Sequence, residues 1–445
     1  MTKMKKIYQS LLIIIGMSVV SFPAWSEELI AKDSTINLER CLQIAQENQP
    51  NIMASTYNVQ AAKSQVGQAA SYFFPQINLN ASYARVNSSA SSSASLGGAG
   101  ATPSLGAGNV NREFDQYKTS IGLTQNIFDF GKVWTGVDIE RYYLKAAKSD
   151  LDNTTSQVVF NVKQYYFKVL QAKHNKSIAE EAVNSYQQHL DQAQGFYKVG
   201  TKPKFDVTKA EVDLSNAKLQ LVQADNTLKV AIVNLNNAMG LANPPEYQIE
   251  DNLSFVKYEV TYDDAISKAY DNRPDLQSLL AKQKAAKKNI YLNVTGYLPT
   301  LAGFADYNWA GQDFPLQDSW DAGLAISFNI FNGFLTQYQI NQAKANYNLM
   351  RANEELLRQG ILLDVQQSYL NLKAAEDTIP VAELAVKQAQ ENLDLANGRY
   401  TAGVGSPIEV TDSQLAYSNA ETNYTAALYN YKVAQASLEK AMGVK

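Results

Sequence analysis

The chain contains two copies of one large unit, and this duplication constrains its fold more than any other feature. The segment GTKPKFDVTKAEVDLSNA begins at Gly200 and GVGSPIEVTDSQLAYSNA begins at Gly403, an offset of 403 − 200 = 203 residues. Near the front of each copy the offset is 299 − 75 = 224 residues, as between Pro75 and Pro299. A duplication of this period indicates two copies of a supersecondary unit, so the fold follows from the unit and its assembly.

The two offsets differ by 224 − 203 = 21 residues, which indicates one insertion in a Ser/Gly/Ala-rich stretch of the first copy. We therefore divide the chain into a leading segment 1–26, repeat one over 27–243 with an inserted flexible loop at 87–111, and repeat two over 244–445. The leading segment has a basic start, a short apolar core and a small-residue cleavage site at Ala24-Trp25-Ser26. This pattern predicts a cleaved secretory signal peptide.

Composition excludes several classes of protein. After the leading segment there is no run of about 18 apolar residues, so membrane-spanning helices are not expected. The single Cys41 excludes a disulfide framework and predicts a buried, inert thiol. A net charge of −4 predicts no binding to nucleic acid.

Each copy has the pattern helix, strand, strand, long helix, turn, long helix. The first helix is predicted over Leu38–Tyr72 in repeat one and over Tyr262–Leu298 in repeat two, each ending at a proline that opens a strand. The long helix from Lys132 to Val199 lacks proline and would be roughly 100 Å long. Its counterpart in repeat two contains Pro380, where a kink or break is expected.

Apolar and polar residues alternate along the four strands. A half-buried soluble sheet has this pattern, and so does a membrane barrel with an apolar exterior and a wet interior. Strands of about ten residues can cross a bilayer obliquely, and aromatic residues cluster near their ends as an interfacial belt requires. The apolar positions are Ile77, Leu79, Ala81 and Tyr83, then Ile121, Leu123 and Ile127, and in repeat two Trp320, Ala322, Leu324, Ile326, Phe328 and Ile330.

The returning helices carry a heptad pattern in which small and large residues alternate along one seam. A sustained period of 3.5 predicts left-handed coiled packing, and the frequent alanines allow helix axes to approach closely. A hairpin of this length with a polar far face needs copies of itself as neighbours. Four strands leave two open edges, which a bilayer does not tolerate, so if these strands span a membrane, several chains must share one barrel. The seams are Val207, Ala210, Leu214, Ala217, Leu221, Ala224, Leu228, Ala231, Leu235 and Ala238, and Val410, Ser413, Tyr417, Ala420, Tyr424, Ala427, Tyr431, Ala434, Leu438 and Ala441.

The order of these elements resembles the TolC family of outer-membrane efflux proteins. The likeness rests on the duplicated layout, the junction segments NIFDFGKV and NIFNGFLT, and the Gly-x5-[Asp/Glu]-Val tips, and it covers nearly all of the mature chain. It implies a mainly α fold with a membrane β-barrel. A homotrimer would form one 12-stranded barrel in outer-membrane lipid, continuous with a 12-helix periplasmic α-barrel. It also implies a periplasmic adaptor and an inner-membrane pump of ABC, RND or MFS type. The lack of a cysteine near the cleavage site is typical of unlipidated members.

The resemblance also points to a periplasmic gate at the tips of the helical hairpins. Glu409 and Asp412 match the positions of constricting acidic rings, which would attract cations. Tyr400 and Asp206 match a hydrogen-bond lock between neighbouring hairpins, whereas the basic partner of that lock is replaced by Gly405. Other interpretations remain open for two of these residues. Ser406-Pro407-Ile408-Glu409 is a capping box, which accounts for Glu409, and Tyr400 continues a heptad seam.

Gly200 and Gly403 end the outgoing helices, where a left-handed cap is expected, and they would leave room for an adaptor tip. We expect no enzyme, cofactor or metal site, because His174 and His189 lack metal-ligand spacing and no catalytic motif is present. The predicted function is a passive, gated exit duct in the outer membrane for efflux or type I secretion. The alternative is a coiled-coil structural or adhesive surface protein without a pore. The cargo, drugs or secreted proteins, is left open.

Overall fold

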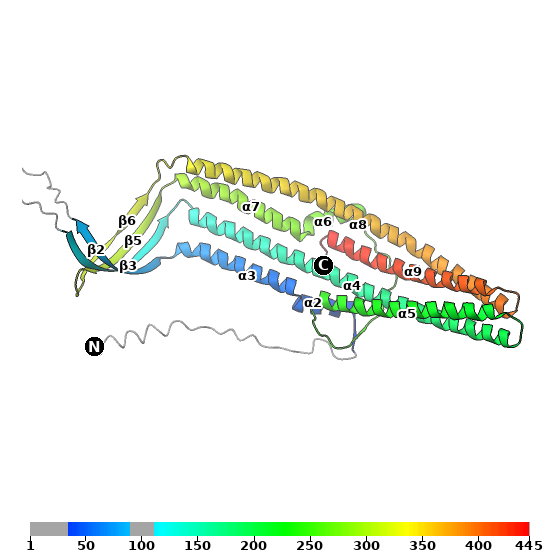
Figure 1. Cartoon of the computed structure of the whole chain (residues 1–445). Coiled ribbons are helices and arrows are strands. Elements are labelled where there is room, and N and C mark those ends of the chain that lie inside the picture. Colours follow the sequence, from blue (N-terminus) through cyan, green and yellow to red (C-terminus); the bar gives the residue numbers. More distant parts are fainter. Residues whose placement is uncertain (1–33, 90–110, 445) are drawn as a thin grey trace, which may run out of the picture.

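The computed structural model of the protein describes residues 34–89 and 111–444. The molecule is elongated, with a small sheet at one end, long helices running away from it, and two helical hairpins at the opposite end (Figure 1). The predicted signal peptide and residues 90–110 of the predicted loop lie outside the described residues. Residues 87–89 and 111, at the two ends of that predicted loop, belong to strands.

Both repeats follow the same order of helix, helix, strand, strand, long helix and returning helix. In repeat one these elements are α2 (Leu38–Asn48), α3 (Pro50–Ala70), β2 (Gln76–Ser89), β3 (Asn111–Phe128), α4 (Lys132–Lys198) and α5 (Lys204–Ala238). In repeat two they are α6 (Tyr262–Asn272), α7 (Pro274–Val294), β5 (Thr300–Gly311), β6 (Gln317–Ser327), α8 (Leu335–Thr401) and α9 (Pro407–Ala441). Equivalent helices have identical lengths of 11, 21, 67 and 35 residues in the two repeats.

The first helix of each repeat differs from the prediction of one continuous helix. Pro50 and Pro274 begin a second helix, and the residues before them are extended, with ψ of 119° at Gln49 and 121° at Arg273. Proline cannot donate to the preceding turn, and its ring disfavours helical geometry at the residue before it. The predicted helices therefore end early, and short 3-10 turns (η1, Ser71–Phe73; η2, Thr295–Tyr297) complete the path to the strands.

The long helices match the prediction in extent but not in the effect of Pro380. α8 runs continuously through Pro380, so the expected break is absent, and Figure 1 shows one long, gently curved helix. The predicted seams of α5 and α9 are confirmed, because every seam position is buried or half-buried. Among the helices of the described residues, none combines the length and the apolar character needed to cross a membrane.

The sheet is antiparallel with the strand order β2-β3-β5-β6, so the last strand of repeat one pairs with the first strand of repeat two. The register places apolar residues in rows across the strands on one face of the sheet and polar residues in rows on the other. One row is Leu79, Ile121, Tyr307 and Trp320, and a row on the opposite face is Asn80, Ser120, Asn308 and Ser319. Apolar side chains such as Ile77, Leu79 and Leu324 are exposed in the single chain. The predicted alternation is therefore present as far as Ser327, where β6 ends, so Phe328 and Ile330 lie beyond the strand to which they were assigned. The single chain leaves the apolar face uncovered within the described residues.

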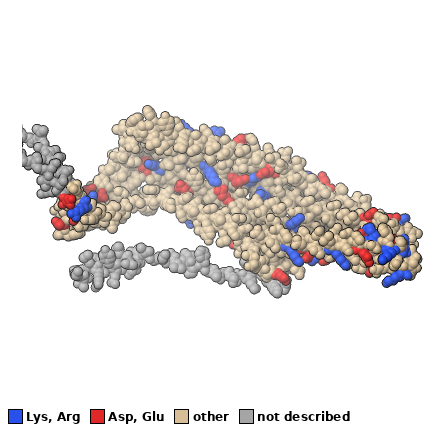
Figure 2. Space-filling model, in the orientation of Figure 1, with Lys and Arg blue, Asp and Glu red and all other residues tan. Residues whose placement is uncertain are grey.

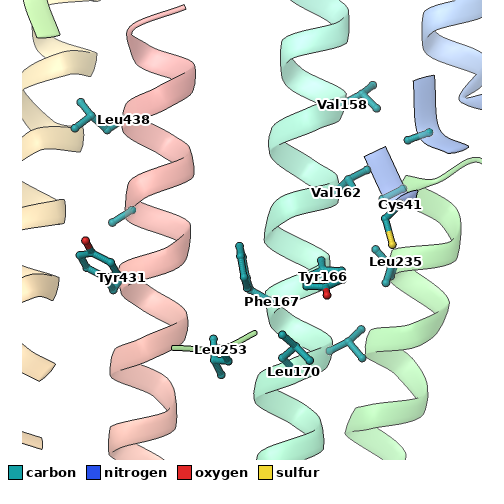
Figure 3. Packing of buried hydrophobic residues seen from close by; sticks show 14 of the residues in the cluster. Cys41, Val158, Val162, Tyr166, Phe167, Leu170, Leu235, Leu253, Tyr431 and Leu438 are labelled. Carbon is teal, nitrogen blue, oxygen red and sulfur yellow. The ribbon is translucent and has the colours of Figure 1, made fainter. Parts of the chain in front are cut away.

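The largest core lies near the middle of the molecule and takes most of its residues from α2, α4, α5, α8 and α9, with smaller contributions from α3, α6 and α7; Figure 3 shows part of it. Cys41 is fully buried there, and burial raises the pKa of its thiol to about 12, in agreement with the predicted inert cysteine. The segment between the repeats is held against this core by two buried tyrosines. The Tyr166 hydroxyl donates to the carbonyl of Glu250 at 2.7 Å, and the Tyr431 hydroxyl donates to that of Val256 at 2.8 Å. A short parallel sheet, β1 (Thr35–Ile36) with β4 (Gln248–Ile249), adds a second link.

Candidate functional site at the hairpin tips

The two hairpin tips have the same backbone design. Gly200 and Gly403 both have a φ of +79°, which places them in the left-handed region predicted for helix caps. The Gly200 amide donates to the Tyr197 carbonyl and the Gly403 amide to the Tyr400 carbonyl, each at 3.0 Å. The amide of the following residue in each turn donates to the carbonyl five residues before it, also at 3.0 Å. This pair of hydrogen bonds is the Schellman arrangement, which satisfies the last carbonyls of a helix.

Tyr400 is the most deeply buried residue of the candidate gate. Its exposure is 0 %, and it packs in a small cluster with Ala396, Val410 and Phe196. The ring lies 4.7 Å from the His189 ring and 5.7 Å from the Phe196 ring, both on α4. Tyr400 belongs to hairpin two (α8 and α9), whereas these two partners belong to hairpin one (α4 and α5). Tyr400 therefore occupies a socket that its own hairpin and the other repeat form together.

The structure brings Asp206 close to Tyr400 without a hydrogen bond between them. Asp206 is 6 % exposed, in the first turn of α5. Burial raises the pKa of the Tyr400 phenol, and the Asp206 carboxylate raises it further. Within the described part of this one chain the Tyr400 hydroxyl has no hydrogen-bond partner. The two residues that match the family's lock are thus neighbours, and the phenol oxygen is buried and unpaired.

Glu409 and Asp412 lie on the exposed side of α9. Ser406 is the N-cap of this helix, as predicted, and its hydroxyl accepts the Ile408 amide at 3.2 Å. The Glu409 carboxylate does not complete a reciprocal capping box; it accepts a hydrogen bond from Arg399 Nε at 3.2 Å, and its side chain remains 46 % exposed. An exposed ion pair of this kind contributes about 0.2–1 kcal/mol. Asp412 is exposed as well, so both carboxylates are accessible at the tip.

A second contact between the hairpins is centred on Asp213, a residue that periodicity does not single out. Asp213 is buried on α5 and accepts hydrogen bonds from Lys209 Nζ at 2.5 and 2.7 Å and from the Thr411 hydroxyl of α9 at 3.0 Å. The Lys209 and Asp213 spacing of four residues predicts an ion pair on one helix face. Nothing in the sequence indicates that a threonine of the other repeat completes the site.

The two histidines have separate roles. His189 is buried in α4, and burial lowers the pKa of its imidazole, with Asp213 and Asp206 acting in the opposite direction. Its Nδ1 has no hydrogen-bond partner within residues 34–89 and 111–444. His174 lies 15 residues earlier and forms a pair with Asp251 at 2.6 Å between its Nε2 and a carboxylate oxygen. The described residues include no group of three or more His, Cys, Asp or Glu side chains suited to hold a metal ion.

Charged residues are not spread evenly over the molecule. On the face drawn in Figure 2, lysine, arginine, aspartate and glutamate gather at the hairpin tips, and long stretches of the helices nearer the sheet carry few of them. The tips combine a buried socket around Tyr400 with an exposed surface of mixed charge. Such a surface can attract small ions, and a partner protein with a complementary charge pattern can bind to it.

A family model described as outer membrane efflux protein matches residues 41–241 and 265–444. The outer membrane protein TolC of Escherichia coli K12 is 26 % identical over 454 residues, covering 97 % of this chain and 85 % of TolC. The alkaline protease secretion protein AprF of Pseudomonas aeruginosa is 22 % identical over 366 residues, covering 77 % of this chain and 73 % of AprF. Among solved structures, the Campylobacter jejuni CmeC outer membrane channel has a TM-score of 0.78 at 18 % identity, covering 94 % of this chain and 90 % of CmeC.

Proposed function

The chain belongs to the outer membrane efflux protein family, and on this basis we propose that three copies form a passive, gated exit duct. The protein is an outer-membrane protein, similar to TolC over nearly its whole length. In the proposed assembly the strands of the three copies close into one barrel, and the long helices continue it as a periplasmic tunnel. Efflux or secretion then depends on energy supplied by partner proteins.

The observation that carries the proposal is the uncovered sheet. β2 and β6 each have one paired neighbour among the described residues, and no other part of residues 34–89 and 111–444 covers the apolar face of the sheet. An open edge leaves backbone N–H and C=O groups without partners, which a lipid environment does not tolerate. Closure into a barrel removes both edges and turns the row of Leu79, Ile121, Tyr307 and Trp320 toward lipid.

The contacts inside one chain provide a rule for adding further copies. β3 of repeat one pairs with β5 of repeat two, so by the duplication β6 would pair with β2 of a neighbouring copy. In the same way α4 packs on α9 within the chain, whereas α8 and α5 form no extended contact within the described residues. α5 and α8 expose apolar side chains, among them Val222, Val233, Leu384 and Leu395. A head-to-tail contact of this kind closes into a ring when the rotation that relates neighbouring copies is a whole-number fraction of a full turn.

The gate of the proposed duct lies at the hairpin tips. Three-fold symmetry would bring six carboxylates, from Glu409 and Asp412, to one opening, where they attract cations and repel one another. Tyr400 and Asp206 would hold hairpin two against hairpin one in the closed state. The capped turns at Gly200 and Gly403 would form the docking surface for a periplasmic adaptor, which links the duct to an inner-membrane pump.

Planar-bilayer recording of the purified protein tests the proposal. We expect a cation-selective conductance, and Glu409→Ala combined with Asp412→Ala should raise it and weaken block by divalent cations. The matched control is Glu259→Ala with Asp263→Ala, which removes the same charge from exposed positions in and just before α6, away from the tips (Figure 1).

Absence of any conductance, even after the tip acids are neutralised, would contradict a duct. Unchanged currents in the double variant of a conducting protein would limit Glu409 to its surface pair with Arg399 and would leave Asp412 without a role in the gate. Native mass spectrometry of the same preparation should find three copies of the chain. A different copy number would require another closure of the barrel.

A further inference from the structure

Gly405 and Lys202 occupy equivalent positions in the two repeats, since 405 − 203 = 202. Gly405 can carry no side chain, because a Cβ placed on it would lie 2.7 Å from the backbone nitrogen of Tyr400 and 2.9 Å from the carbonyl carbon of Arg399. The Gly405 amide also donates to the Arg399 carbonyl at 2.9 Å, which keeps the two backbone segments together. The tip of hairpin two therefore has a bare stretch of backbone where hairpin one has a lysine.

Lys202 reaches this bare backbone from the other hairpin. Its Nζ donates a long hydrogen bond of 3.4 Å to the Gly405 carbonyl and lies 5.6 Å from the centre of the Tyr400 ring. An ammonium group over an aromatic face is attracted by the ring quadrupole, and partial burial strengthens that attraction. Lys202 is half-buried, and its two contacts are both made to hairpin two. A single side chain thus links the turn of repeat one to the turn of repeat two.

We infer that Lys202 is a positioning residue of the gate, which clamps the hairpin-two tip onto hairpin one through the Gly405 carbonyl and the Tyr400 ring. The inference rests on the proposed duct function and deepens it. His189 and Phe196 contact Tyr400 from α4, and Lys202 holds the same ring from the turn. The basic group that the tip of repeat two lacks is supplied by the equivalent position of repeat one. Because the clamp acts inside one chain, each copy can hold its own hairpin closed.

Amide hydrogen exchange tests the clamp without reference to conductance. In the full-length assembled protein, Lys202→Ala should speed the exchange of the Gly405 amide and its neighbours in residues 399–409 by roughly three- to tenfold, because the lost ammonium contacts stabilise the packed tip. Lys202→Arg keeps a cation that can reach both partners and should retain most of the protection. Lys204→Ala removes an exposed lysine two residues away and is the matched control.

Exchange in Lys202→Ala that equals both wild type and Lys204→Ala would overturn the inference. Loss of protection in Lys202→Arg equal to that in Lys202→Ala would also overturn it, because a cation that can reach both partners would then give no protection.

Bilayer recording of the same variants separates this inference from the proposed function. In a conducting protein Lys202→Ala should raise the mean current by roughly two- to tenfold relative to Lys204→Ala, because more of the gates are open. If wild type and the acid-neutralised variant both fail to conduct while exchange follows the expected order, the duct is wrong and the clamp stands. If the protein conducts normally while exchange is unchanged in Lys202→Ala, the clamp is wrong and the duct stands.

Discussion

The tips of the two hairpins have the same backbone and opposite side-chain roles. Both turns have a left-handed glycine with a φ of +79° and the same pair of capping hydrogen bonds. Tyr197 of hairpin one is 47 % exposed, whereas its equivalent in hairpin two, Tyr400, is 0 % exposed. Asp206 is buried and its equivalent Glu409 is exposed. Hairpin one therefore contributes to the socket, and hairpin two contributes the tyrosine that the socket holds.

A duplicated backbone therefore does not impose equivalent contacts. α4 packs against both α5 and α9, so its tip contacts two returning helices inside the chain. α8 packs against α9 and has no extended contact with α5 within the described residues, so its outer side is left open. The asymmetric burial of Tyr197 and Tyr400 follows from these unequal neighbours. In the proposed trimer, hairpin two would be the part of each copy that moves.

The asymmetry between the tips is disturbed most strongly if Tyr400 is truncated. Tyr400→Ala should cost about 3–5 kcal/mol in the local stability of the tip, the range for removing a fully buried aromatic side chain. Tyr197→Ala should change it by no more than about 0.5 kcal/mol, as at most exposed positions. Amide exchange across residues 396–410 measures both. Tyr400→Phe is the control for the unpaired hydroxyl and should be close to neutral; a large loss would mean that the hydroxyl has a partner from another copy.

A smaller effect is expected from filling the space at Gly405. Gly405→Ala should destabilise the hairpin-two tip by about 1–3 kcal/mol, because the added Cβ would overlap the Tyr400 and Arg399 backbone. Gly398→Ala serves as the control, since no described atom apart from the neighbouring backbone of α8 lies within 4 Å of its Cβ position. That control should stabilise the helix by about 0.5–1 kcal/mol. Equal behaviour of the two variants under limited proteolysis of the tip would show that the close approach at Gly405 does not persist in solution.

Acid should loosen the contact between His189 and Tyr400. The pKa of His189 is lowered from 6.5 by burial, so the packed tip favours the neutral imidazole and binds fewer protons than an open tip. The stabilisation is therefore complete above pH 6.5 and declines as the pH falls from 6.5 toward the lowered pKa. The groups that act on His189 are Asp206, Asp213 and Lys209 of α5, with the Tyr400 ring of α8 against it.

The measurement is the pH dependence of channel conductance or of tip exchange between pH 7.5 and pH 5. We expect opening on acidification in the wild type and a flatter profile in His189→Asn, which installs the residue of the equivalent position, Asn392. A wild-type tip that tightens in acid would mean that attraction of the protonated imidazole to Asp206 and Asp213 outweighs its burial.

The smallest effect is expected on the exposed face of hairpin two. Arg399→Ala should lower stability by less than about 1 kcal/mol, because its pair with Glu409 is exposed and screened by salt. A double-mutant cycle with Glu409→Gln measures the coupling between the two side chains. A coupling energy well above this range would indicate that a neighbouring copy buries the pair. The acidic residue would then be buried at both tips, as Asp206 already is in hairpin one.

Much of the fold could be predicted from the sequence because it depends on local periodicity. The length of α4, the seams from Val207 and Val410, and the caps at Gly200 and Gly403 all follow from patterns that one segment carries by itself. The prediction of one helix over Leu38–Tyr72 was wrong, because Pro50 begins a new helix there. A kink or break was expected at Pro380, and the break was wrong, since α8 continues through this residue.

The candidate site was less accessible to sequence reasoning. Glu409 and Asp412 are recognisable from the tip motif, and the capping role of Ser406 follows from residue type. Sequence patterns do not identify Asp213, His189 and Lys202 as site residues. Each of them contacts a residue of the other repeat, about two hundred positions away in the chain. A periodic pattern tells which face of a helix is buried, but it does not tell which helix covers that face.

The sequence by itself determines the duplicated unit and its outer-membrane family. It also determines the long helices with their seams, the alternating strands and the glycine-capped turns. The burial of Tyr400 beside an exposed Tyr197, and the meeting of Lys202 with the backbone of Gly405, come from tertiary packing alone. A cap is formed within the last turn of one helix, and a heptad pattern marks the apolar stripe of one helix, so both can be recognised in a local stretch of sequence. The tip contacts depend instead on how α9 lies along α4, a packing between segments far apart in the chain.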